Sequence, residues 1–221
     1  MANTQSVENY LKVICNLSEF GKTSVTTNKL AAAMEMKAAS VTDMMKKLAN
    51  RKFIKHIPYK GVTLTEHGKK TAMQIIRKHR LWELFLTSTL HFKWDEVHNI
   101  AEQMEHIESD ELINRIDKFL GYPKFDPHGD PIPDSKGRLP LRNSTSLASC
   151  EAGYSGTVTG VQDHSAAYLN HLVLLGIQLG DNLKIISKSD YDKSLKIKLS
   201  KGKELFITQD VANNLMITKI K

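Results

Sequence analysis

The chain has 221 residues, 41% of them apolar, which allows one large or two small globular domains. No apolar run could cross a membrane and no secretion signal is recognisable at the N-terminus, so we expect a cytoplasmic protein. The net charge of +7 lies entirely in residues 1–74, which hold 12 of the 31 Lys and Arg but 5 of the 24 Asp and Glu, and this indicates a polyanionic partner for that segment.

Helical periodicity predicts a first helix at Val7–Phe20, a short second helix from about Thr26 to Met34 and a third at Ser40–Asn50. Small residues fill the corner before the third helix, at Ala38 and Ala39. Two short helices joined by a tight corner are typical of a helix-turn-helix, and small residues at the corner allow close approach to DNA.

Two short strands are expected at Phe53–Ile57 and Gly61–Thr65, around a turn that begins at Pro58. They would form a basic wing beside the helix-turn-helix. In such a module the recognition helix reads bases, while lysines of helix and wing bind phosphates. The predicted DNA-binding residues are Thr27, Lys37, Ala39, Ser40, Thr42, Asp43, Lys46, Lys47, Lys55 and Lys60.

Three further helices follow: a long one from Glu66, one at Trp94–Ile107 and one at Ser109–Leu120. The helix expected at Ser109–Leu120 has more apolar residues than it needs for the one face that packs against the core. Because helix-turn-helix proteins usually bind a two-fold symmetric DNA site as dimers, we expect this region to form a dimer contact. The other residues expected there are Trp82, Leu86 and Trp94.

Metal-ligating side chains recur at helical spacing in these helices. If the helix at 94–107 is regular, four donors share one face, and His79 and Glu83 are one turn apart on the preceding helix. The four donors are His98, Glu102, Glu105 and His106. Buried together, two carboxylates and two imidazoles need a divalent cation; the alternative is a solvated polar face.

From Gly121 to about Ser149 the chain is rich in Pro and Gly, which predicts a structured loop and a linker. Short alternating strands and a helical stretch at Asp163–Leu174 then predict a small, partly closed barrel. Five histidines have no donor at ligand spacing and are expected in the wing, on the surface or in loops: His56, His67, His91, His128 and His171. Neither Cys15 nor Cys150 has the CxxC spacing of a zinc site, so we expect buried or loop cysteines.

Four motifs and the order of the parts resemble the diphtheria-toxin-repressor and manganese-transport-regulator family of metal-dependent transcriptional repressors. The resemblance covers essentially the whole chain. The motifs are Glu8-Asn-Tyr-Leu, Arg77-Lys-His-Arg-Leu with Glu83, Glu102-Gln-Met-Glu-His-Ile with Ser109-Asp, and Asp126-Pro-His-Gly-Asp-Pro-Ile-Pro. In addition, Leu175-Gly-Ile-Gln-Leu-Gly-Asp is similar to the SH3-like domain that many of these repressors share with ferrous-iron transport accessory proteins.

The resemblance implies two metal sites. The ancillary site would consist of His79, Glu83 and His98, and the primary regulatory site of Asn9, Glu102, Glu105 and His106. The family's barrel domain also donates ancillary ligands, but the matching positions here are about Ser165 and Tyr168. Asp163 or His164 could substitute, and the alternative is that these two residues are a surface pair on a short helix.

Three positions bear on the metal. The iron-responsive branch has a cysteine at the position of Glu102 and a methionine at that of Asn9, whereas the manganese branch has carboxylates at both. Oxygen ligands favour hard cations, so the cofactor is expected to be manganese(II) or iron(II), with manganese favoured. Lys12 stands where the manganese branch often has an acidic ligand, which argues against a two-manganese cluster of that type.

The expected fold is mainly α with a small β domain. It comprises a winged helix-turn-helix at 1–74, a helical dimerisation and metal-binding domain at 75–121, a loop and linker at 122–149, and an SH3-like domain at 150–221. The expected function is a metal-activated, homodimeric repressor of metal-uptake genes that binds double-stranded operator DNA and is no enzyme. The alternatives are a metal-independent winged-helix regulator and a metallohydrolase that uses the Glu/Glu/His cluster.

Overall fold

A computed structural model describes residues 5–57 and 59–220, and residues 1–4, 58 and 221 lie outside its description. The turn expected at Pro58 therefore falls partly outside the described residues. The chain divides into two compact units. The first comprises residues up to 79 with 102–114 and 133–139, and the second comprises 80–101, 115–132 and the chain from 140 onwards.

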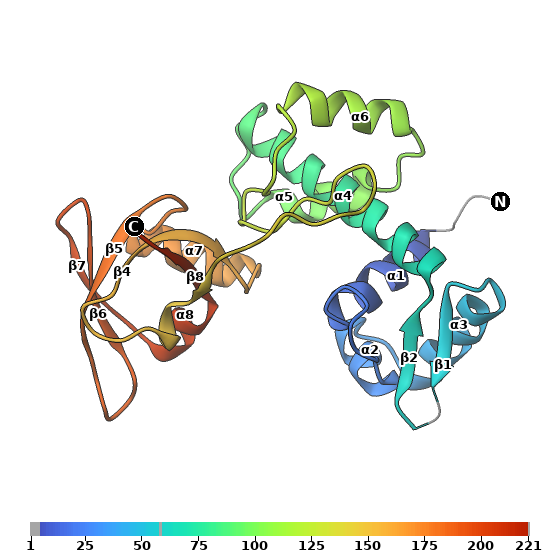
Figure 1. Ribbon diagram of the computed structural model, residues 1–221, viewed down its shortest axis with the longest axis horizontal. Helices are drawn as coiled ribbons and strands as arrows, with labels where there is room; N and C mark the ends of the chain where they lie inside the picture. Colours follow the sequence, from blue (N-terminus) through green and yellow to red (C-terminus); the bar gives the residue numbers. More distant parts are fainter. Residues whose placement is uncertain (1–4, 58, 221) are drawn as a thin grey trace. The chain divides into compact units, whose positions relative to one another are not determined.

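The first unit contains a winged helix-turn-helix, as the sequence predicts (Figure 1). Its elements are α1 (Gln5–Leu17), α2 (Thr27–Ala33), α3 (Ala38–Asn50), β1 (Ile54–Ile57) and β2 (Gly61–Leu64). Thr26 caps α2, because its side-chain oxygen accepts a hydrogen bond from Lys29 N. The apolar stripes of the three helices meet in one core, in which Leu11, Leu30 and Leu48 are fully buried.

The wing is a two-stranded antiparallel ribbon in which Ile54 pairs with Leu64 and Lys55 with Thr63. Val25 adds an isolated bridge to Val62 on the outer side of β2. Gly61 is required at this crossing, because it has a φ of +98° and a Cβ there would lie 2.1 Å from the carbonyl oxygen of Val25.

The helical region consists of α4 (Glu66–Ser88), α5 (Val97–Met104) and α6 (Asp110–Phe119). The helix expected at 94–107 is shorter than predicted, and Glu105 and His106 lie in the turn after α5. The prediction of four donors on one regular helical face is therefore wrong.

The expected dimer residues are also corrected. Trp82 and Leu86 are buried within the chain, and Trp94 packs against the core of the barrel domain. Trp82 and Leu86 are therefore not available to a partner, whereas Trp94 is half-buried. Phe119 of α6 is 67% exposed while its ring edge contacts Phe85, so this residue keeps the surface role expected for α6.

The second unit ends in a six-stranded antiparallel sheet of order β3-β8-β4-β5-β6-β7, which agrees with the small β domain expected. The strands are β3 (Thr145–Ser146), β4 (Ser155–Val161), β5 (Asn182–Lys188), β6 (Leu195–Leu199), β7 (Glu204–Ile207) and β8 (Leu215–Lys219). A short 3-10 helix (Leu147–Ser149), α7 (Ala166–Leu175) and α8 (Gln209–Asn214) complete the domain. The alternating pattern of each strand buries one face, as in β6, where Leu195, Ile197 and Leu199 point into the core. Among the described residues, no helix is long and apolar enough to span a membrane.

Candidate metal centre and DNA-binding surface

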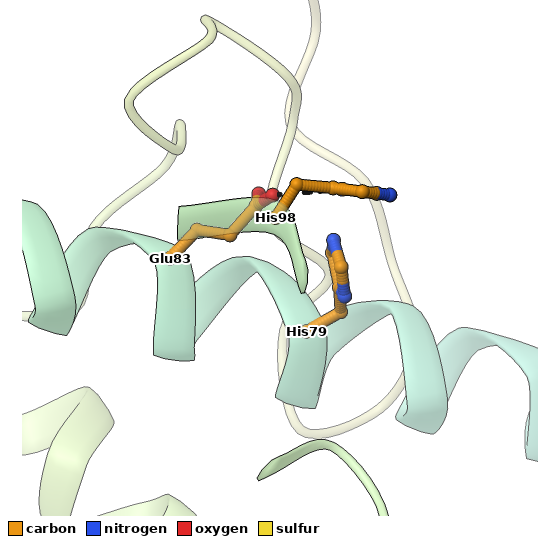
Figure 2. A group of neighbouring side chains, drawn as sticks. All are labelled: His79, Glu83 and His98. Carbon is orange, nitrogen blue, oxygen red and sulfur yellow. Dashed lines mark hydrogen bonds and ion pairs between the residues drawn. The ribbon is translucent and has the colours of Figure 1, made fainter. Parts of the chain in front are cut away.

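Two imidazoles and one carboxylate converge beside α4. His79 and Glu83 lie one turn apart on this helix, and His98 comes from α5 (Figure 2). Their ligand atoms all lie within 4.8 Å of one another, and His98 Nδ1 is 3.3 Å from Glu83 Oε1. The structure therefore brings together the three residues that the resemblance assigns to the ancillary site.

The chemistry of this group suits a divalent cation. Glu83 is buried, with 3% of its side chain exposed, whereas 44% of the His98 side chain is exposed and leaves a route from solvent. A buried carboxylate flanked by ring nitrogens gives a mixed oxygen and nitrogen donor set, which binds manganese, iron or zinc. The residues present thus fit a metal.

The Pro/Gly-rich loop adds two buried donors to the same carboxylate. Glu83, Asp126 and His128 form a second group of possible ligands, and His128 Nδ1 lies 3.5 Å from Glu83 Oε2. His128 lies in a loop, as expected, but the expectation that it has no donor partner is wrong, because its side chain is 1% exposed and faces Glu83. We call His79, Glu83, His98, Asp126 and His128 the Glu83 centre.

The charges of these buried groups shift one another's pKa values. Burial would lower the pKa of His128, but the hydrogen bond and charge of Glu83 outweigh it and raise that pKa to about 9. Burial and the charge of Glu83 raise the pKa of Asp126 to about 7. Without a metal, a proton on His128 thus balances the charge of Glu83.

Local hydrogen bonds fix the loop that carries these donors. Asp126 Oδ1 accepts hydrogen bonds from His128 N at 2.8 Å and Asp130 N at 2.9 Å. Arg80 of α4 donates to Asp130 Oδ2 at 3.0 Å. The motif Asp126-Pro-His-Gly-Asp was visible in the sequence, but a ligand role for it was not, because its partner Glu83 lies more than 40 residues earlier.

Of the two substitute barrel ligands, the structure places only His164 near the Glu83 centre. The His164 ring stacks on His128 with centroids 4.9 Å apart, and burial lowers its pKa. Asp163 instead accepts a hydrogen bond from Ser165 N at 2.8 Å, just before α7. Asp163 is therefore not part of this group.

Two of the four residues expected at the primary site, Glu102 and Glu105, flank an ammonium group. Lys12 Nζ of α1 lies 3.2 Å from Glu102 Oε1 and 2.8 Å from Glu105 Oε1. The Lys12 side chain is 10% exposed and that of Glu105 is fully buried, whereas 46% of the Glu102 side chain is exposed. We call Lys12, Glu102 and Glu105 the Lys12 cluster.

Glu105 connects the Lys12 cluster to His79, whose Nδ1 lies 2.6 Å from Glu105 Oε2. Burial alone would raise the pKa of Glu105, but the hydrogen bond from His79 and the charge of Lys12 lower it. Glu105 is therefore ionised at neutral pH and accepts from both side chains.

The remaining predicted primary ligands have other surroundings. His106 Nδ1 lies 2.6 Å from Glu8 Oε2, a carboxylate on α1 that sequence reasoning did not single out. The amide oxygen of Asn9 is buried and receives no hydrogen bond from the described residues. Asn9 thus lies on α1 and His106 contacts that helix, and His106 belongs to none of the groups of possible His, Cys, Asp and Glu ligands among the described residues.

The predicted DNA contacts form an exposed polar surface on α3 and the wing. All are exposed except Thr27, which is half-buried and bonded to Met45. Thr42 donates its hydroxyl hydrogen to Ala38 O, and Lys46 pairs with Asp43 at 3.2 Å. The exposed lysines Lys37, Lys47, Lys55 and Lys60 complete this surface.

Three protein-family models match the chain. The N-terminal DNA-binding domain of iron-dependent repressors matches residues 3–62, and their metal-binding and dimerisation domain matches residues 65–134. A FeoA domain matches residues 145–219.

Known proteins show the same likeness. An uncharacterized HTH-type transcriptional regulator of Methanocaldococcus jannaschii is 33% identical over 117 residues, which are 53% of this chain and 94% of that protein. The iron-dependent repressor IdeR of Mycobacterium tuberculosis is 30% identical over 128 residues, 58% of this chain and 55% of its own length. A solved manganese-dependent transcriptional repressor in complex with manganese is 33% identical, with a TM-score of 0.88 over 97% of this chain and 100% of that chain.

A winged helix-turn-helix joined to a group of metal-ligating side chains defines a metal-dependent DNA-binding regulator, not an enzyme. The chain belongs to the diphtheria-toxin-repressor and manganese-transport-regulator family of metal-dependent transcriptional repressors. The resemblance expected from the sequence is thereby confirmed, and so are the fold class and the repressor function.

Proposed function

We propose that this chain represses metal-uptake genes when manganese(II) or iron(II) binds at the Glu83 centre. The observation that carries the proposal is the convergence of His79, Glu83 and His98 within 4.8 Å. His164, stacked on His128, is a further donor of the same centre. A bound ion would supply a cross-link between α4, α5 and the loop at 126–128.

We favour manganese over iron. The Glu83 centre offers carboxylate oxygens and imidazole nitrogens without sulfur, and Glu102 is a carboxylate where the iron-responsive branch has a thiolate. Such donors suit the harder cation. The relatives include both an iron-dependent repressor and a manganese-dependent one, so a direct comparison of the two ions is needed.

The predicted primary site does not fit a metal in the arrangement found. The Lys12 ammonium already lies between Glu102 and Glu105, and Asn9 offers only a neutral oxygen. An ion held by Asn9, Glu102, Glu105 and His106 therefore has no part in the proposed mechanism.

On the DNA side, we propose that the exposed polar residues of α3 read bases and that the wing lysines bind phosphates. A homodimer would present two recognition helices to a two-fold operator in the cytoplasm. We retain the division into a DNA-binding segment at 1–74, a dimerisation and metal-binding segment at 75–121, a loop and linker at 122–149 and an SH3-like segment at 150–221.

The chain's own residues connect the proposed metal site to the DNA-binding domain. A carboxylate only accepts hydrogen bonds, so His79 donates through Nδ1 to Glu105, and this contact holds its ring beside Glu83. Glu105 in turn accepts from Lys12 on α1, which packs in the core of the helix-turn-helix. Metal binding shifts operator affinity only by its differential affinity for the DNA-competent state, typically about 1–3 kcal/mol of coupling.

The test is a metal titration of operator binding. An operator is first selected from random duplexes with manganese(II) present, and its affinity is then measured by fluorescence anisotropy with manganese(II), with anaerobic iron(II) and with chelator. Wild type should bind tighter with metal by about 5- to 150-fold. Glu83→Gln should lose this gain, whereas Glu66→Gln, an exposed change on the same helix, should keep it. An operator affinity that is the same with either ion and with chelator would favour the alternative of a metal-independent winged-helix regulator.

A further inference from the structure

The Lys12 cluster contains a cation that belongs to the chain itself. The ammonium lies 2.8–3.2 Å from oxygens of two carboxylates, which is within the range of N–H···O hydrogen bonds. Its two partners, Glu102 and Glu105, lie 90 and 93 positions after Lys12 in the sequence. Lys12 is thus held in a defined place by tertiary structure and is no freely moving surface lysine.

We propose that the Lys12 ammonium takes the place of a metal ion between Glu102 and Glu105, so that each chain binds its activating metal only at the Glu83 centre. This inference rests on the proposed function. It adds that the chain of contacts from the metal through His79 and Glu105 ends in the DNA-binding domain at a fixed lysine, Lys12.

Space and charge both argue for this replacement. Hard divalent ions bind carboxylate oxygens at roughly 2.0–2.6 Å, so an ion that bridged Glu102 and Glu105 would coincide with the ammonium. An ion beside the ammonium would meet like charge at close range in a buried place. A third neighbour of Glu105, His106, approaches with Nε2 at 3.9 Å and has no negative charge of its own, and the Glu8 carboxylate beside it is already paired with His106 Nδ1. From α1, Asn9 likewise contributes no negative charge.

Expulsion of Lys12 by a metal is also unfavourable. Its side chain is 10% exposed, and Glu105 is fully buried, so removal of the ammonium leaves a buried carboxylate without its cation. The chain therefore completes the connection from His79 through Glu105 to α1 without a second ion.

The experiment counts bound manganese(II) on the full-length chain, with free ion measured by its electron paramagnetic resonance signal. In the wild-type background, Glu83→Gln should remove all tightly bound manganese. Lys12→Glu should gain one additional ion per chain, and that ion should survive in Lys12→Glu/Glu83→Gln. Lys22→Glu makes the same charge change at an exposed position and should gain none.

Each failure has a different meaning. If Glu83→Gln with Lys12 intact still binds an ion that Glu102→Gln then removes, a metal does enter the Lys12 cluster and the inference is overturned. If neither Lys12→Glu nor the milder Lys12→Gln gains an ion, the cluster is only a salt bridge and the inference also fails. If wild type binds neither manganese nor iron, the proposed function fails instead. Circular dichroism of each variant establishes that it is folded, and the Glu83→Gln arm decides without any change at Lys12.

Discussion

His79 donates a 2.6 Å hydrogen bond from Nδ1 to the fully buried carboxylate of Glu105. This contact fixes the tautomer and the ring orientation of one proposed metal ligand. The same carboxylate accepts from Lys12 of α1 at 2.9 Å. A single buried residue is therefore in contact with both a metal ligand and the DNA-binding domain.

Glu105→Gln should weaken metal binding although Glu105 is not a ligand at the Glu83 centre. The amide keeps the shape but loses the charge that makes His79 a stronger donor, and outer partners of this kind typically contribute about 10- to 100-fold in metal affinity. Competition with a fluorescent chelator measures the change. Glu108→Gln, exposed and close in sequence, is the control and should leave affinity unchanged.

Lys12→Met should destabilise the metal-free protein by about 3–5 kcal/mol, because it leaves the buried Glu105 carboxylate without its cation. The double variant Lys12→Met/Glu105→Gln should recover part of this loss, since it removes both charges. Urea unfolding of wild type, Lys12→Met, Glu105→Gln and the double variant gives the coupling energy between the two residues. Additive effects of the two changes would contradict a direct interaction.

The metal-free protein should lose stability from His128 as pH rises. Burial lowers the pKa of His128, but Glu83 raises it to about 9, above the ordinary value of 6.5. A raised pKa stabilises the fold below pH 6.5, and this contribution disappears as pH rises through about 9. The stability difference between wild type and His128→Gln, measured in chelator, should shrink by roughly 1–3 kcal/mol over that window. A difference that stays constant with pH would show that His128 is neutral throughout.

Gly129→Ala should displace the loop of the Glu83 centre. Gly129 has a φ of +82°, and an added Cβ would lie 2.1 Å from Thr159 O on β4. Gly180 is the matched control, because its φ is +88° but a Cβ there meets nothing within 4 Å. Gly180→Ala should cost only about 1 kcal/mol of backbone strain, while Gly129→Ala should cost more and lower manganese affinity as well. Equal effects of the two substitutions on affinity would argue against a role of the loop.

Replacing Lys46 and Lys47 by Ala should weaken binding to all DNA sequences together. Each lysine that no longer neutralises a phosphate should reduce the slope of log affinity against log salt by about 0.9. Changes at Ser40 or Thr42 should instead alter the preference among sequences. Lys193→Ala, on the barrel domain, serves as the control and should change neither. A lysine variant that alters only base preference would place α3 in a different register on DNA.

The sequence by itself determined the elements and several faces of this protein. Helical periodicity located α1, α2 and α3, two-residue alternation located β6 and its neighbours, and i, i+4 spacing placed His79 beside Glu83. These signals are local, so they can be read without knowledge of the chain path. The motifs also identified the family, and from it the pairing of these two residues with His98.

Tertiary structure decided which donors meet. Because α5 ends at Met104, His98 contacts Glu83, Glu102 and Glu105 both contact Lys12, and His106 contacts Glu8. The four side chains expected on one face therefore belong to separate groups. His128 became a buried neighbour of Glu83 only through the docking of a loop whose sequence reads as irregular. Contacts between residues such as 12 and 105 depend on the packing of segments far apart in the chain, and periodicity carries no information about such distances.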